Sequence, residues 1–263
     1  MDDKKEMNTT EKVLDFIVHL SREMMENGAN LERINISIRR VCKCYQLRDI
    51  STLYANSVLS VGVMDEQGVS YVRQENIPFT GIHLQRLGRL NLLVHKIMNE
   101  KPDPDKLLDM LYEALLVKSY SNTVQIAGYI LAMICLCRIF GGTLPDMVVV
   151  AINTAALFFI TMFFARAKLN RIISNIAAMM FCGCMAIITT RIGFARNMSA
   201  IIITNAFYLI PGIPMVNAVR NIFCGNEMNG IIELVKVLLE VVTIVAGLYI
   251  ACLIFGADAV ALF

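Results

Sequence analysis

Apolar residues follow two different patterns along the chain, and the change falls near Tyr120. Before that point they recur at helical or alternating spacing among charged residues, which predicts a folded water-soluble domain. After it they form long runs with few charges, which predicts helices that cross a membrane. We therefore expect a membrane protein with an N-terminal α+β domain over residues 1–120 and a transmembrane bundle over residues 121–263.

Within the N-terminal part, the apolar spacing predicts two helices, two strand-like runs and two further helices. The first helix is expected over residues 11–27 and ends at Gly28, because glycine readily adopts the left-handed conformation that stops a helix. Asn30 can cap a second helix that runs to about Tyr45. The strand-like runs cover residues 52–63 and 69–74 with a hairpin loop at 65–68, and the last helices cover 81–99 and 105–117.

Five apolar runs make up the C-terminal part. Each is about 18–21 residues long, which is the length that a helix needs to cross roughly 30 Å of hydrocarbon. They cover residues 123–140, 147–165, 172–190, 198–218 and 237–255. Short loops between them predict an up-down bundle of five transmembrane helices.

Charge is distributed as this division requires. Sixteen of the Lys and Arg residues and seventeen of the Asp and Glu residues precede residue 121, and only eight and five follow it. The formal net charge is +2, so nothing indicates a nucleic acid partner. The N-terminus shows no signal-peptide pattern.

Loop charges predict an orientation. Arg166, Lys168 and Arg171 lie between the second and third runs, and the positive-inside rule assigns this loop to the cytoplasm. The N-terminal domain is then cytoplasmic, and the C-terminus is outside. Arg191 and Arg196 fall on the outer side in this arrangement, which weakens the assignment.

The fourth apolar run contains an unusual break signal. Pro211 and Pro214 flank Gly212, and proline removes a backbone donor and clashes with the preceding helical turn. Broken backbone at membrane depth is tolerated only where protein covers it or a watery cavity reaches it, and transporters place substrates at such breaks. We expect Pro211, Gly212 and Pro214 to open the helix, with Gly212 allowing a positive φ or close backbone approach. Asn217 and Arg220 follow the break and are candidate pathway residues. The alternative is a kink that serves packing alone.

Further polar residues within the runs are candidates for the same pathway. Asn153 and Asn205 each lie six or seven residues into a run, about 10 Å deep, and Asn175 lies in the third run. The alternative is that these amides only hydrogen-bond neighbouring helices. Glu240 is the only acid well inside a run, so it is a candidate for proton coupling or, alternatively, reaches the interface beside Lys236.

We find no motif for a catalytic centre, a phosphate loop or a metal site, so we expect no enzymatic activity and no cofactor.

Two motifs resemble the threonine/serine exporter family. Residues 28–33 (Gly-Ala-Asn-Leu-Glu-Arg) are similar to a stretch near the start of family members, and residues 209–220 are similar to the family's Pro-Gly-x-Pro, Asn-Ala, Arg signature. The resemblance is to the split form of the family, in which a second, smaller membrane protein completes the transporter. Asn221 and Asn226 depart from the family pattern, which commonly has Asp at both places.

The resemblance implies a transporter subunit that exports small amino acids such as threonine and serine, or dicarboxylates such as succinate. Its expected partners are membrane lipid, a small membrane-protein subunit and a small substrate that carries a carboxylate. The alternative is a membrane-anchored sensor or regulator whose helices only hold the soluble domain. That alternative predicts plain apolar helices without the double-proline break or the Asn residues at shared depth.

Overall fold

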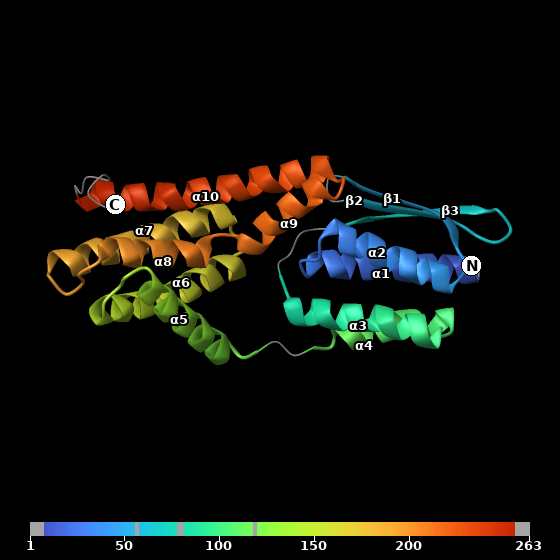
Figure 1. Cartoon of the computed structure of the whole chain (residues 1–263), viewed down its shortest axis with the longest axis horizontal. Helices are drawn as coiled ribbons and strands as arrows, with labels where there is room; N and C mark the ends of the chain where they lie inside the picture. The colour runs from blue at the N-terminus through green and yellow to red at the C-terminus, as the bar shows by residue number, and fades with distance from the viewer. Residues whose placement is uncertain (1–7, 56–57, 78–81, 118–119, 256–263) are drawn as a thin grey trace. The chain divides into compact units, whose positions relative to one another are not determined.

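The computed structural model of the chain describes residues 8–55, 58–77, 82–117 and 120–255 (Figure 1). These residues form two compact units. The first comprises Met1–Lys118 with Ile213–Leu234, and the second comprises Ser119–Gly212 with Val235–Phe263. The predicted extracellular C-terminal tail falls on residues 256–263, which lie outside the described residues.

The first unit begins with two helices whose ends follow local rules. Helix α1 (Thr9–Glu26) ends at Gly28, whose φ of +94° is the left-handed conformation expected of a helix-stopping glycine. Helix α2 (Leu31–Cys44) begins after Asn30, whose side chain accepts a hydrogen bond from the Arg33 amide at 3.1 Å. Both predictions are confirmed.

A three-stranded antiparallel sheet follows, in the order β1-β2-β3. Its strands are β1 (Arg48–Ala55), β2 (Val58–Met64) and β3 (Ser70–Asn76). The prediction of one strand over 52–63 is wrong, because two paired strands divide this run and its apolar spacing did not mark the division. The predicted hairpin loop after β2 is confirmed, since the Asp65 carboxylate accepts hydrogen bonds from the amides of Gln67 and Val69 at 2.9 and 2.8 Å.

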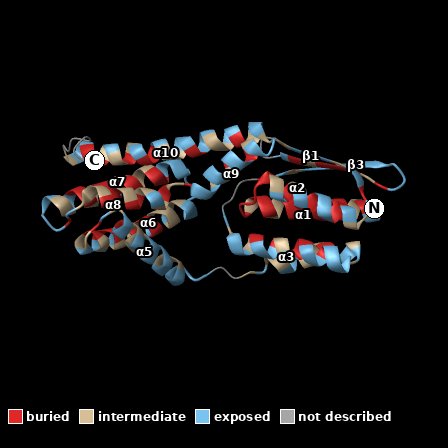
Figure 2. Ribbon diagram, in the orientation of Figure 1, coloured by how far each residue is buried: buried red, intermediate tan, exposed pale blue. Residues whose placement is uncertain are grey.

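Helices α1 and α2 lie between the sheet and a second helical layer, formed by α3 (Leu84–Glu100) and α4 (Leu107–Leu115) with a short 3-10 turn, η1 (Pro104–Lys106) (Figure 1). The residues buried between these layers form one hydrophobic core, which includes Phe16, Ile38 and Leu90 (Figure 2). The remaining members of this unit are α9 (Gly212–Phe223) from Ile213 onward and the first turns of α10 (Glu227–Phe255).

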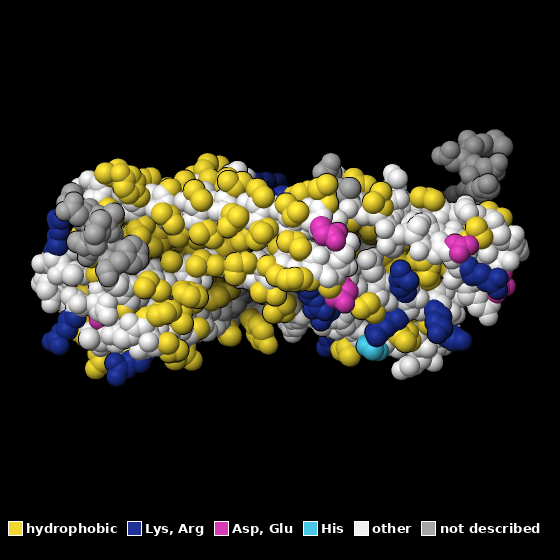
Figure 3. All heavy atoms as spheres, turned by 45° about the horizontal axis from the view of Figure 1, so that its top comes forward, with side chains coloured by type: hydrophobic (Ala, Val, Ile, Leu, Met, Phe, Trp, Pro, Cys, Tyr) yellow, Lys and Arg dark blue, Asp and Glu magenta, His cyan; other side chains and the backbone are white. Residues whose placement is uncertain are grey.

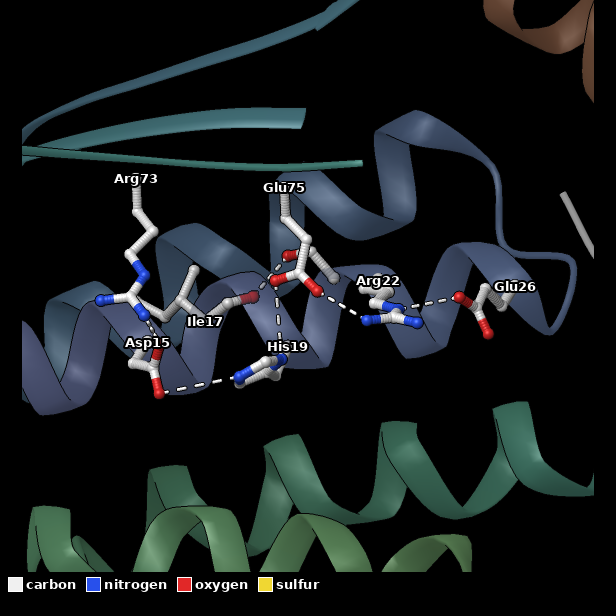
Figure 4. Close-up of polar contacts among 8 residues, drawn as sticks. Asp15, Ile17, His19, Arg22, Glu26, Arg73 and Glu75 are labelled. Carbon is white, nitrogen blue, oxygen red and sulfur yellow. Dashed lines mark hydrogen bonds and ion pairs between the residues drawn. The ribbon is translucent and has the colours of Figure 1, made fainter. Parts of the chain in front are cut away.

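A row of charged side chains joins α1 to β3 (Figure 4). Arg73 on β3 pairs with Asp15 at 2.7 Å, and Arg22 on α1 pairs with Glu75 at 2.7 Å. His19 lies between the carboxylates of Asp15 and Glu75, at 3.7 and 3.6 Å. These contacts satisfy charges at the edge of the sheet, so we assign them a structural role.

The second unit consists of apolar helices. They are α5 (Asn122–Ile139), α6 (Leu144–Arg166), α7 (Arg171–Arg191), α8 (Met198–Leu209) and the rest of α10. Within the described residues, four helices are long and apolar enough to cross a membrane, and five spans result if the broken pair α8 and α9 counts as one. Hydrophobic side chains cover the visible surface of these helices (Figure 3), as expected of a membrane protein.

Small residues let the helices of the second unit approach closely. A Cβ at Gly247 of α10 would lie 2.5 Å from the Ile176 carbonyl oxygen of α7, and a Cβ at Gly183 would lie 2.8 Å from the Ala251 side chain. Membrane helices associate by such close contacts, because lipid provides no hydrophobic driving force between them. Glycine at these two positions therefore fixes how α10 packs on α7.

Candidate functional site

The second unit contains a cavity of about 380 Å³. Four helices, α5 to α8, and the loop before α7 contribute to its wall. Its lining residues are Tyr129, Thr161, Phe164, Ala165, Leu169, Arg171, Ser174, Asn175, Tyr208 and Leu209. The wall thus combines apolar side chains with a few hydrogen-bonding groups and one cation, as in sites that bind small polar molecules.

The first turns of α7 supply the most polar part of this wall. Arg171, Ser174 and Asn175 are spaced i, i+3 and i+4, so they lie on one face of the helix. Asn175 is buried, and its side-chain NH₂ group has no hydrogen-bond partner among the described residues. The start of a helix also carries a partial positive charge, so this wall is suited to an anionic group.

Glu240 of α10 places a carboxylate beside this wall. Its Oε2 lies 3.3 Å from the Arg171 Nε, an ion pair that does not meet hydrogen-bond geometry. The sequence suggested Lys236 as the neighbour of Glu240, and the contact with Arg171 was not predicted. The cavity wall therefore carries a cation that is itself close to an acid.

Two fully buried asparagines lie deeper in the same unit. Asn153 on α6 and Asn205 on α8 both have an amide nitrogen and an amide oxygen without a hydrogen-bond partner in the described chain. Buried amides are nearly always paired, and an unpaired one costs about 1–3 kcal/mol per group in a soluble protein. These two side chains are thus unusual for a role in packing alone.

The expected equal depth of Asn153 and Asn205 follows from a contact at the start of their helices. The Asp146 carboxylate on α6 accepts a hydrogen bond from the Asn197 amide, directly before α8, at 3.1 Å. Asn153 is seven residues beyond Asp146 and Asn205 is eight beyond Asn197, which corresponds to about 10 and 12 Å along packed helices. Asn205 also lies one turn before Tyr208 on the same face of α8, and Tyr208 lines the cavity.

The predicted break in the fourth run is present. Helix α8 ends at Leu209, Ile210 is extended with ψ of 125°, and α9 begins at Gly212 directly after Pro211. Pro214 lies in the first turn of α9, where its missing N–H is tolerated. One part of the prediction is wrong. Gly212 has no positive φ, and no atom lies within 4 Å of a Cβ placed there, so it provides neither special backbone freedom nor close approach.

Asn217 and Arg220 belong to the first compact unit, with the N-terminal domain. The Asn217 side chain donates to the Gly28 carbonyl at 3.2 Å, and the Arg220 guanidinium pairs with Glu32 at 2.7 Å. Of the predicted pathway residues, the second unit therefore contains Asn153, Asn175, Asn205, Pro211 and Gly212, and the first unit contains Pro214, Asn217 and Arg220.

Sequence reasoning missed several residues of the cavity. Tyr129, Thr161 and Tyr208 are isolated polar side chains in apolar runs and gave no signal. Arg171 was considered only as a loop charge. The i, i+3, i+4 spacing of Arg171, Ser174 and Asn175 was the available signal for a polar helix face.

Helices of membrane-spanning length that are apolar outside and surround a pocket with a few polar side chains are typical of an integral membrane protein of the transport class. Comparison with protein families agrees. The chain belongs to the family described as "Putative threonine/serine exporter" (ThrE), whose profile matches residues 15–255. This is a family of membrane transporters and not of enzymes. No curated protein and no solved structure matches the chain.

Proposed function

We propose that the chain is a subunit of a membrane exporter and that the cavity between α5 and α8 binds its substrate. The observation that carries this proposal is the cavity wall at the start of α7, where Arg171, Ser174 and the unpaired Asn175 share one face. An arginine guanidinium can hold a carboxylate with two parallel hydrogen bonds. The neighbouring hydroxyl and amide groups orient a small polar molecule.

The ion pair at the cavity favours an amino acid over a dicarboxylate. A zwitterion such as threonine or serine brings a carboxylate for Arg171 and an ammonium group for Glu240, so both charges of the pair remain compensated. Succinate brings two negative charges, and the second would lie near the Glu240 carboxylate. Threonine and serine are therefore the proposed substrates, and dicarboxylates such as succinate are the second candidate.

The buried asparagines extend the proposed pathway. From Tyr208 at the cavity, Asn205 lies one helical turn back toward the start of α8. Asn153 lies at a similar distance from the start of α6. Unpaired amide groups can donate to and accept from a substrate that has left water. Glu240, whose carboxylate lies beside Arg171, is the proposed coupling residue.

In the proposed arrangement α8 and α9 are the two halves of one broken span, which makes five spans in a bacterial plasma membrane. The N-terminal domain lies in the cytoplasm. Many transporters are built from two related halves. We therefore expect a small partner membrane protein, as in the split form of the family. Full transport by the purified chain alone in liposomes would refute this part.

A counterflow assay in vesicles tests the site. Vesicles with the chain and its partner should exchange labelled threonine or serine, and Asn175→Leu should lower the rate at least tenfold. Glu240→Gln should lower amino acid exchange and improve the relative exchange of succinate, since it removes the charge that repels a dianion. Thr190→Val is the matched control on α7, because its hydroxyl already donates to the Ala186 carbonyl at 2.8 Å. Wild-type rates of amino acid exchange in Asn175→Leu and Glu240→Gln, as in the Thr190→Val control, would reject the cavity as the substrate site.

A further inference from the structure

The two motifs that carry the family resemblance are in contact within the first compact unit. The Asn217 side chain of α9 donates a hydrogen bond to the Gly28 carbonyl at 3.2 Å. The Arg220 Nε and Nη2 atoms both reach the Glu32 Oε2, at 2.9 and 2.7 Å. Residues almost 190 positions apart thus form one contact, which nothing in the local sequence pattern predicts.

The turn between α1 and α2 presents the acceptors for this contact. Gly28 caps α1, and its φ of +94° leaves its own carbonyl free of the helix. A Cβ at this position would also lie 3.2 Å from the Ile82 side chain, a tight contact that adds to the preference for glycine set by the positive φ. Asn30 caps α2 and so fixes Glu32 in the first helical turn, where a carboxylate is favoured.

Helix α9 presents the donors. Asn217 and Arg220 are three residues apart and therefore share a face. Gly230 of α10 packs against this helix, since a Cβ there would lie 2.7 Å from the Ala218 carbonyl oxygen. The next residue toward the N-terminus, Asn229, donates to the Tyr54 carbonyl of β1 at 3.0 Å. The pair of helices α9 and α10 thus meets the N-terminal domain at three separate places.

These contacts are suited to be made and broken. The side chains of Arg220 and Glu32 are 53% and 36% exposed, and exposed ion pairs are weak and screened by salt. Each of the other contacts is a single hydrogen bond. A permanent clamp would be expected to bury apolar surface, whereas Val216 and Phe223 of α9 remain exposed.

We propose that Gly28, Glu32, Asn217 and Arg220 form a latch through which the N-terminal domain positions α9, the helix that directly follows the Pro211 break. Helix α9 is continuous in sequence with the bundle through this break, so a change in the domain alters the transport step. The latch rests on the transport function proposed above. Asn217 and Arg220 are then positioning residues, and the substrate site lies in the cavity at α7.

Charge reversal tests the positioning role. Glu32→Arg and Arg220→Glu should each lower the maximal counterflow rate at least tenfold while the substrate KM stays within twofold, because the cavity is intact. The double variant restores the pair with opposite charges and should recover the rate to within threefold of wild type. Arg39→Glu is the matched control, since Arg39 is exposed on α2 and its side chain makes no hydrogen bond or ion pair with the described residues. Normal rates for both single reversals, or no recovery in the double variant, would overturn the latch.

A second measurement detects the contact without transport. The Cys224 thiol lies beside the Glu32 carboxylate and is exposed. In Glu32→Cys, a short bifunctional thiol reagent should join the new thiol to Cys224 in membranes, and Cys224→Ser should abolish the product. Absence of this product would refute the latch whatever the transport rate. Failure of wild-type vesicles to transport would instead refute the proposed function and, with it, the positioning role, although the cross-link would still form.

Discussion

Replacing Asn205 with leucine should make the protein more stable and inactive. Asn205 is fully buried on α8, and neither its amide nitrogen nor its amide oxygen has a hydrogen-bond partner among the described residues. Leucine has the same branching and nearly the same size, so it fits the site without a cavity or a clash. The substitution therefore removes two unpaired polar groups and little else.

The expected gain follows from these two groups. An unpaired buried group costs about 1–3 kcal/mol when the unfolded chain is in water. In a bilayer the unfolded helix also remains in lipid, and measured side-chain contacts between membrane helices average about 0.6 kcal/mol with a maximum near 1.7. We expect Asn205→Leu to raise the free energy of unfolding by about 1–2 kcal/mol. This corresponds to a factor of roughly 5–30 in the folded to unfolded ratio.

Reversible unfolding in mixed micelles with increasing dodecyl sulfate measures this gain, and counterflow on the same preparation measures activity. Thr190→Val is the control for loss of a polar side chain that is already bonded, and it should lose up to about 1 kcal/mol. A stabilised variant with at least tenfold lower counterflow would support the pathway role. A destabilised variant that transports normally would show that Asn205 only holds helices together, and the pathway assignment would be wrong.

Three further outcomes follow from the structure. Burial raises the pKa of the Cys42 thiol to about 12, so a maleimide should label it at least a hundredfold more slowly than a free thiol at pH 8, and at the full rate in denaturant. The hydrogen bond from Arg220 lowers the pKa of Glu32 below its ordinary 4.5. The stabilising contribution of this pair is therefore complete above pH 4.5 and is lost as the pH falls through the lowered pKa. An NMR titration of the Glu32 carboxyl group can follow this loss. Gly247→Ala should destabilise the bundle by about 1–3 kcal/mol because its Cβ would collide with the α7 backbone, whereas Gly128→Ala, with open space at its Cβ, should be neutral or slightly stabilising in the same unfolding assay.

Local chemistry predicted much of the fold. Gly28 and Asn30 mark the end of α1 and the start of α2 because capping depends on one or two residues, and the structure follows them. The apolar runs predicted membrane helices because the thickness of the bilayer sets how many apolar residues such a helix needs. Pro211 predicted the break between α8 and α9 because proline disrupts the helical turn that precedes it. The division of 52–63 into two strands escaped notice, since strand-like residue types continue on both sides of residues 56–57 and do not distinguish one long strand from two paired strands.

The contacts that carry the proposals could not be predicted in this way. Arg171 and Glu240, and Arg220 and Glu32, are far apart in sequence, and helical periodicity gives a face but no partner for it. The positive φ or close approach predicted for Gly212 from the freedom of glycine is not present. Gly247 looked unremarkable in an apolar run, although the structure makes it one of the closest helix contacts.

Helix α10 is longer than the hydrocarbon core of a bilayer is thick, so we expect membrane thickness to affect how this helix packs. Its 29 residues are about 43 Å long at 1.5 Å per residue, which exceeds the roughly 30 Å of hydrocarbon. Residues 235–255, the part that packs in the second unit, account for about 31 Å, and the turns before them belong to the first unit with α9. A hydrophobic helix that exceeds the hydrocarbon thickness adapts by tilting or by changing its contacts, and the first turns of α10 contact α9 at Gly230. We therefore expect the transport rate to depend on lipid chain length, which counterflow in vesicles of different lipids can measure.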